Sequence, residues 1–148
     1  MKKYLGVKLI EAEPMNLGDY NKFRGWTIPE NEDPLKEGYR VVYPDGYVSW
    51  SPKDIFEKAY MQVGDNNTIT QQIVDNFIAC YKDYKLDDKT TVVKATLVNG
   101  FEVVESSSCV DPANFDQEVG ISICLERIKN KVWMLLGFLL QTGICGVK

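Results

Sequence analysis

Residues 90–105 read TTVVKATLVNGFEVVE, two runs rich in β-branched residues that are separated by Asn99 and Gly100. An Asn-Gly pair between two such runs is the strongest short-range signal of a β-hairpin, because both residues tolerate the positive φ angles of a tight turn. We therefore expect one strand over residues 90–98 and a second over 101–105. The order of the elements around this hairpin gives the fold class.

A helix is expected on each side of the hairpin. Upstream, apolar residues at helical spacing predict a helix over about residues 68–84, with Thr68 in a capping box at its start. Downstream, Asp111 and Pro112 form a favourable helix start, with Asp as the N-cap and Pro in the first position. The predicted long helix then runs over about residues 112–140.

The first 63 residues form a separate module in this interpretation. Residues 4–12 read as a strand, 14–38 as a proline-rich loop, and 39–50 as a hairpin that is followed by a short helix. The polar sequence GDNN at 64–67 separates this module from the rest. The predicted fold class is α+β, with a small N-terminal β-hairpin/helix module (1–63) followed by a helix–β-hairpin–long helix module (68–148).

The composition argues against several functional classes. The chain has 148 residues and a net charge of −4, so it lacks the basic footprint that DNA or RNA polymers require. It has no histidine, which removes Ser-His and Cys-His catalytic pairs and all His-containing metal sites. Its four cysteines form no C-x-x-C pair, so we expect no metal, no cofactor and no disulfide, and thiols that are reduced and mostly buried.

The run VWMLLGFLL at 132–140 is apolar on every face of the predicted last helix. It is too short to span a bilayer, and no signal peptide is apparent at the start of the chain. We interpret the run as an interface between copies of the chain rather than as a membrane contact.

The candidate ligand-binding residues gather where the second hairpin meets the last helix. A helix N-terminus offers free N–H groups to an anion, serine hydroxyls precede it, and basic residues one turn apart follow it. An aromatic ring at the start of the second strand could stack on a base. The candidates are Phe101, Ser107, Asp111, Asn114, Arg127 and Lys131.

Plainer interpretations remain open at this point. The serines fit an ordinary surface loop, Phe101 fits a core position, and Arg127 and Lys131 fit a solvated helix face. Asp111 fits a helix cap at least as well as a ligand contact. The dense aromatic residues of the first module fit either a binding platform or the bulky filling of a small core.

Several motifs resemble known phage proteins. The sequence CVDPANF at 109–115, together with Asn99-Gly100-Phe101, Gly120, Trp133 and Gly137, resembles a family of tailed-phage accessory proteins over residues 69–141. In the first module, YLGVK at 4–8, RGW at 24–26 and YVSWSPK at 47–53 resemble a leader module of phage proteins from Gram-positive hosts. Together these features resemble the Thoeris anti-defence sponges, most closely the first type.

The resemblance implies a function without catalysis. Such sponges act in the host bacterial cytoplasm, where they bind the cyclic ADP-ribose signal made by TIR proteins and sequester it undegraded, and some also bind cyclic oligonucleotides. It also implies a homo-oligomer, a dimer or hexamer through the C-terminal helix, with pockets shared between protomers. Phe101 would stack on a base, Arg127 would contact phosphate, and Asp111 and Asn114 would contact ribose or base. The alternatives are a nucleotide-degrading enzyme and a protein–protein inhibitor or structural accessory protein without a small-molecule ligand.

Overall fold

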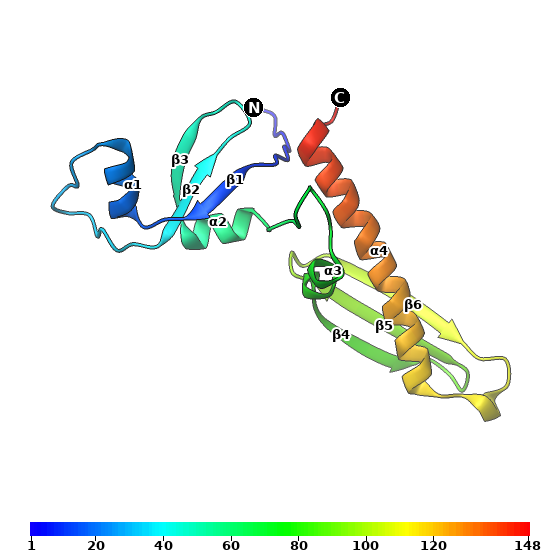
Figure 1. Ribbon diagram of the computed structural model, residues 1–148. Coiled ribbons are helices and arrows are strands. Elements are labelled where there is room, and N and C mark those ends of the chain that lie inside the picture. Colours follow the sequence, from blue (N-terminus) through cyan, green and yellow to red (C-terminus); the bar gives the residue numbers. More distant parts are fainter. The chain divides into compact units, whose positions relative to one another are not determined.

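A computed structural model describes residues 1–148. The chain divides into two compact units, of which the first comprises Met1–Gln62 with Thr142–Lys148 and the second comprises Val63–Gln141 (Figure 1). Two three-stranded antiparallel sheets and four α-helices make up the fold. The predicted α+β class is therefore confirmed.

The second unit contains the sheet β4-β5-β6, with β4 at Ile78–Lys85, β5 at Thr90–Leu97 and β6 at Glu102–Ser108. The predicted hairpin is confirmed as β5–β6, and Gly100 adopts a φ of 85° in its turn. Burial along β5 alternates residue by residue, so that one face of the strand is covered and the other is partly exposed. Such alternation is typical of a sheet with one face packed on a core.

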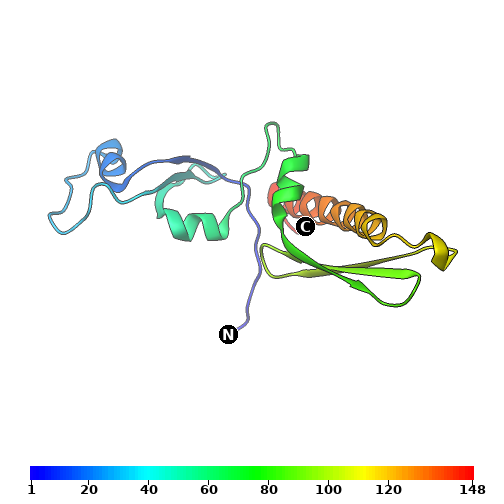
Figure 2. The same ribbon diagram turned by 90° about the horizontal axis from the view of Figure 1, so that it is seen from below.

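Helix α4 (Gln117–Cys145) covers that buried face, as the two views of the ribbon show (Figures 1 and 2). Its buried residues recur every fourth position and form one stripe: Gly120, Cys124, Ile128, Val132 and Leu136. The helix begins beside the end of β6 and runs back along this strand, because Gly120 lies against Thr91, the partner of Ser107, whereas Lys131 contacts Glu105. The stripe and the inward residues of β5 form the core of this unit.

The predicted helix over 68–84 is only half right. Helix α3 covers Gln71–Phe77, and the residues after it form strand β4, which pairs antiparallel with β5. The side chain of Thr70, not of Thr68, caps α3 by accepting a hydrogen bond from the N–H of Ile73 (3.3 Å). Pairing with a neighbouring strand has here overridden a helical apolar spacing, as tertiary context commonly does.

The boundaries of the last helix also differ from the prediction. A separate 3-10 helix occupies Pro112–Asn114, and α4 begins only at Gln117. At the other end α4 continues past Leu140 to Cys145, so Gly143 lies within the helix, and Gly146 follows it with a φ of 75°. The helix is therefore longer at its C-terminal end and starts later than its sequence suggested.

The first unit contains the sheet β1-β2-β3, with β1 at Glu11–Pro14, β2 at Gly38–Val42 and β3 at Val48–Pro52. Helix α2 (Lys53–Ala59) follows β3 directly. The predicted strand over 4–12 is mostly wrong, because Glu11 pairs with Val42, the last residue of β2, and the residues before Glu11 have no strand to pair with.

Helix α1 (Leu17–Arg24) lies within the segment that was predicted to be a loop. Asn16 caps its start by accepting a hydrogen bond from the N–H of Asp19 (2.8 Å), and Gly25 ends it with a φ of 73°. The loop after α1 packs back onto the helix, where a Cβ on Gly18 would lie 2.7 Å from the Cβ of Pro34.

None of the four cysteines forms a disulfide, and only Cys124 is buried. The expectation that most of them are buried is therefore wrong, because Cys80 and Cys145 are exposed and Cys109 is half-buried. None of the helices combines the length and the apolar character that a membrane span requires.

Candidate ligand-binding site

A cavity of about 320 Å³ lies where the start of β5 and the end of β6 meet the start of α4. The segment between β6 and α4, which contains the CVDPANF sequence, folds along one side of it. The residues that line the cavity are Lys89, Thr91, Ser107, Ser108, Cys109, Asn114, Phe115, Asp116, Val119, Gly120 and Ile123. Two of the six candidate residues, Ser107 and Asn114, are among them.

The close approach of α4 to β5 forms the floor of the cavity. A Cβ on Gly120 would lie 2.3 Å from Oγ1 of Thr91, so only glycine allows this contact. The Thr91 hydroxyl is buried and donates a hydrogen bond to Oε1 of Gln117 (3.0 Å). The amide of Gln117 in turn donates to Oδ2 of Asp83 on β4 (3.0 Å), which ties the first turn of α4 to the sheet.

The turn at Asp111 holds the segment above the cavity in shape. Its carboxylate accepts a hydrogen bond from the N–H of Ala113 (3.0 Å), and its carbonyl oxygen accepts one from the Cys109 thiol (3.2 Å). The interpretation of Asp111 as a helix cap is therefore confirmed, although the helix is the short 3-10 segment and not α4. Asp111 does not line the cavity.

The N-terminus of α4 is not free to bind an anion, contrary to our expectation. Oδ1 of Asp116 accepts hydrogen bonds from the N–H groups of Glu118 (3.0 Å) and Val119 (3.3 Å). This carboxylate already satisfies two of the unpaired donors of the first turn and places a negative charge there. An anionic ligand would have to be held by side chains of the site instead.

Lys89 supplies a cation that is not among the six candidate residues. It lines the cavity beside Ser107, and its backbone carbonyl accepts a hydrogen bond from the N–H of Cys109 (3.0 Å). Lys89 forms no ion pair, so its charge is available to a ligand. The pairing of Thr90 with Ser108 brings Lys89 to this place. The signal in the sequence is the hairpin itself, because strand pairing that is extended outward from the Asn99-Gly100 turn places Lys89 near the serines.

Arg127 and Lys131 continue one row of α4 beyond the cavity, because both follow Val119 and Ile123 at four-residue spacing. Arg127 donates a hydrogen bond from Nη1 to the carbonyl oxygen of Ser106 (2.7 Å) and forms no ion pair. Lys131 is paired with Oε1 of Glu105 (2.5 Å). Arg127 thus keeps an uncompensated charge close to the cavity, whereas Lys131 is largely neutralised.

Cys124 lies on the buried stripe, next to this basic row. Burial raises the pKa of the Cys124 thiol, and the nearby charge of Arg127 opposes this rise only in part. A thiol with a raised pKa stays protonated and is a poor nucleophile. The cysteine nearest to the basic row is therefore a core residue rather than a reactive group.

Phe101 is not brought to the cavity within one chain. It precedes the first residue of β6, whereas Ser107 lies near the last, so the two are separated by about 20 Å at the usual rise of a strand. Phe101 is 58% exposed, so its interpretation as a core residue is wrong. The serines are not loop residues either, because Ser106, Ser107 and Ser108 end strand β6.

Lys129 does not line the cavity and lies on a different face of α4 from Arg127 and Lys131. Its Nζ lies 2.9 Å from Oδ1 of Asp75 on α3. The hydrogen bond from Lys129 is the main reason that the pKa of Asp75 is lowered.

No set of three cysteine, aspartate or glutamate side chains in the structure could hold a metal ion.

Comparison with known proteins gives one match. The family model described as "Phage protein (N4 Gp49/phage Sf6 gene 66) family" matches residues 54–144, which include the sheet β4-β5-β6, the cavity and nearly all of α4. No curated protein and no solved structure matches the chain.

Proposed function

We propose that this chain, which belongs to the phage protein (N4 Gp49/phage Sf6 gene 66) family, is an anti-defence sponge. It binds a TIR-derived cyclic ADP-ribose signal, holds it without degrading it and so blocks Thoeris immunity. The proposal includes cyclic oligonucleotides as a second ligand class. The proposal takes its ligand from the sequence resemblance and its site from the cavity at the start of α4.

The cavity is the observation that carries the proposal. Its volume of about 320 Å³ is at the lower end of the range for small-molecule sites. Lys89 and Arg127 are two cations without ion pairs, one in the cavity and one a helical turn beyond its wall. Ser107 and Asn114 add a hydroxyl and an amide, which suit the ribose and base of a nucleotide.

The same cavity favours binding over turnover. Four hydroxyl or thiol groups line the cavity. Thr91 donates to an amide oxygen, Ser108 bonds to Thr90, Cys109 donates to a carbonyl oxygen, and the Ser107 hydroxyl lies beside them. None of these groups is hydrogen-bonded to a base that could activate it, which nucleophilic catalysis requires. Tight binding needs only complementary groups and exclusion of water.

A shared pocket would explain why Phe101 and Ser107 are far apart in one chain. The row of α4 that carries Arg127 also presents Leu135 and Leu139, which are 38% and 39% exposed. In the proposal these side chains pack between copies of the chain in a dimer or hexamer. Phe101 of one protomer then completes the pocket of another by stacking on the base.

Titration calorimetry tests the proposal with two related probes. We expect cyclic ADP-ribose to bind with one ligand per protomer, and linear ADP-ribose to bind at least tenfold more weakly because it lacks the closed ring. Equal affinities for the two probes would show that the protein does not recognise the closed ring of the signal. Absence of binding by any cyclic ADP-ribose isomer or cyclic oligonucleotide would leave the protein–protein inhibitor or structural accessory function.

A further inference from the structure

We propose that the first unit contains a second ligand site, which binds a guanine nucleotide. The site is a cavity of about 510 Å³ between α1, the loop after it and β3. All of its lining residues belong to the first unit, outside the cavity at the start of α4. This inference therefore does not rest on the proposed function.

Aromatic side chains form the walls of this cavity: Tyr20, Trp26, Tyr47 and Trp50. Trp50 is fixed in place, because its Nε1 donates to the carbonyl oxygen of Met15 (2.7 Å) and its ring lies against Gly38, where a Cβ would be 2.3 Å away. Tyr47 is 64% exposed and leaves its ring accessible to a ligand. Aromatic walls of this kind stack on planar groups such as nucleobases.

A carboxylate is held in position at the cavity. Asn21 is only 5% exposed and donates a hydrogen bond from Nδ2 to Oε2 of Glu32 (3.2 Å). The loop that carries Glu32 is itself anchored to α1, because the N–H of Gly18 donates to the carbonyl oxygen of Pro34 (2.9 Å). An ionised carboxylate only accepts hydrogen bonds, so its partner in a ligand must present donors.

A cation stands in the same cavity. The guanidinium carbon of Arg24 lies 4.9 Å from the centroid of the Trp26 ring, and Arg24 forms no ion pair. A guanidinium that is held over an aromatic ring is well suited to bind phosphate. The cavity thus combines a stacking surface, an acceptor and a cation.

These three features together select guanine among the nucleobases. The Watson–Crick edge of guanine carries two adjacent donors, N1–H and the N2 amine, which match the two oxygens of one carboxylate. Adenine presents a donor beside an acceptor on this edge, and the acceptor would face Glu32 unfavourably. The phosphate of the nucleotide then pairs with Arg24.

Titration of the full-length protein with GMP, IMP and AMP tests this site. We expect GMP to bind at least tenfold more tightly than AMP, with IMP between them because it lacks the N2 amine. Glu32→Gln should reduce the affinity for GMP at least tenfold, and Arg24→Ala should reduce the affinity for GMP to that for guanosine. Tyr47→Ala, at an exposed position, should weaken the binding of all three nucleotides.

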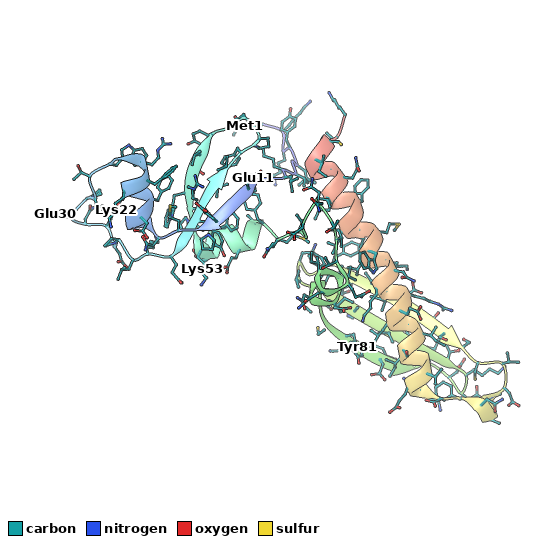
Figure 3. The ribbon with its side chains drawn as sticks, in the orientation of Figure 1. Met1, Glu11, Lys22, Glu30, Lys53 and Tyr81 are labelled. Carbon is teal, nitrogen blue, oxygen red and sulfur yellow. The ribbon has the colours of Figure 1, made fainter.

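Matched controls exist on the same elements. Glu30 and Lys22 are exposed, carry the same charges and do not line the cavity, and Figure 3 marks both beside α1. Glu30→Gln and Lys22→Ala should bind GMP like the unchanged protein. Equal affinity for GMP and AMP, undiminished binding by Glu32→Gln, or binding of a proline-rich peptide instead of any nucleotide would overturn the assignment.

Discussion

Gly120 of α4 lies directly against Thr91 of β5, so that a Cβ at position 120 would be 2.3 Å from the threonine hydroxyl oxygen and 2.8 Å from its Cβ. Real side chains do not approach so closely, and Thr91 is itself almost fully buried. This contact sets the distance between the helix and the sheet at the floor of the cavity. The shape of the cavity and the stability of the second unit therefore both depend on it.

Gly120→Ala should destabilise the protein although alanine is the better helix former. Overpacking of a tight contact costs about 1–3 kcal/mol, which exceeds the gain of about 1 kcal/mol from helix propensity. The control is Gly137→Ala, in the same helix, where a Cβ would meet nothing within 4 Å and the propensity gain should appear alone. Urea unfolding measures both, and stabilisation by Gly120→Ala would contradict the contact.

Asp116→Ala should destabilise the start of α4. The substitution removes the acceptor for the N–H groups of Glu118 and Val119, and the loss of an N-cap costs about 1 kcal/mol. Asp116→Asn retains the cap and should cost much less. Urea unfolding of the two variants separates the cap from the charge, and an equal loss in both would show that the hydrogen bonds are not the cause.

Arg127→Ala should weaken the binding of cyclic ADP-ribose by about 10–100-fold, because the proposed site would lose a charge-assisted hydrogen bond to phosphate. Lys129→Ala is the matched control, since Lys129 lies two residues away and pairs with Asp75 instead. Phe101→Ala should also lose affinity if its ring stacks on the base. Calorimetry that finds no change in Arg127→Ala and Phe101→Ala would remove both residues from the site.

Leu135→Glu should dissociate the proposed oligomer. The substitution introduces a charge into the row of α4 that we place between protomers, where it would be desolvated without a partner. Leu35→Glu, at a 76% exposed position in the first unit, is the control and should leave assembly unchanged. Light scattering coupled to size exclusion gives the mass of each, and an unaltered mass for Leu135→Glu would place the interface elsewhere.

Lys129→Met should raise the pKa of Asp75 toward its ordinary value of 3.8, because the hydrogen bond from Lys129 is the main cause of the lowered pKa. A lowered carboxyl pKa means that the pair contributes stability above pH 3.8 and loses it as the pH falls through the folded-state pKa. Lys131→Met, which removes the partner of Glu105 instead, should leave Asp75 unchanged. NMR titration of the Asp75 carboxyl distinguishes these results.

The predictable parts of the fold are those in which local signals agree with tertiary packing. Asn99-Gly100 fixed the hairpin because its turn chemistry and the flanking strands point to one structure. The helix prediction for residues 78–85 was wrong because these residues pair with β5. Their apolar spacing is helical, and no local signal reports the strand pairing that overrides it. Helix α1 was missed because it has few apolar residues, although Asn16 and Gly25 mark its two ends.

The site shows the same division. Ser107 and Asn114 could be placed at the cavity from the sequence, because one follows the predicted strand and the other lies in the first turn of the predicted helix. Lys89 was missed because it enters the cavity through strand pairing across 18 positions, from Thr90 to Ser108. The prediction that the N-terminus of the last helix is free to bind an anion was wrong, because Asp116, a residue of the connecting segment, caps α4. Phe101 can join the site only through a second protomer, which one sequence does not reveal.

The most direct test of the central claim is capture and release of the signal. The protein is mixed with the cyclic ADP-ribose products of a TIR enzyme, filtered, and then heated to release what it holds for mass analysis. Our account predicts that the signal disappears from the filtrate and returns with its mass unchanged after denaturation. A signal that returns with an altered mass, or that never leaves the filtrate, would contradict it.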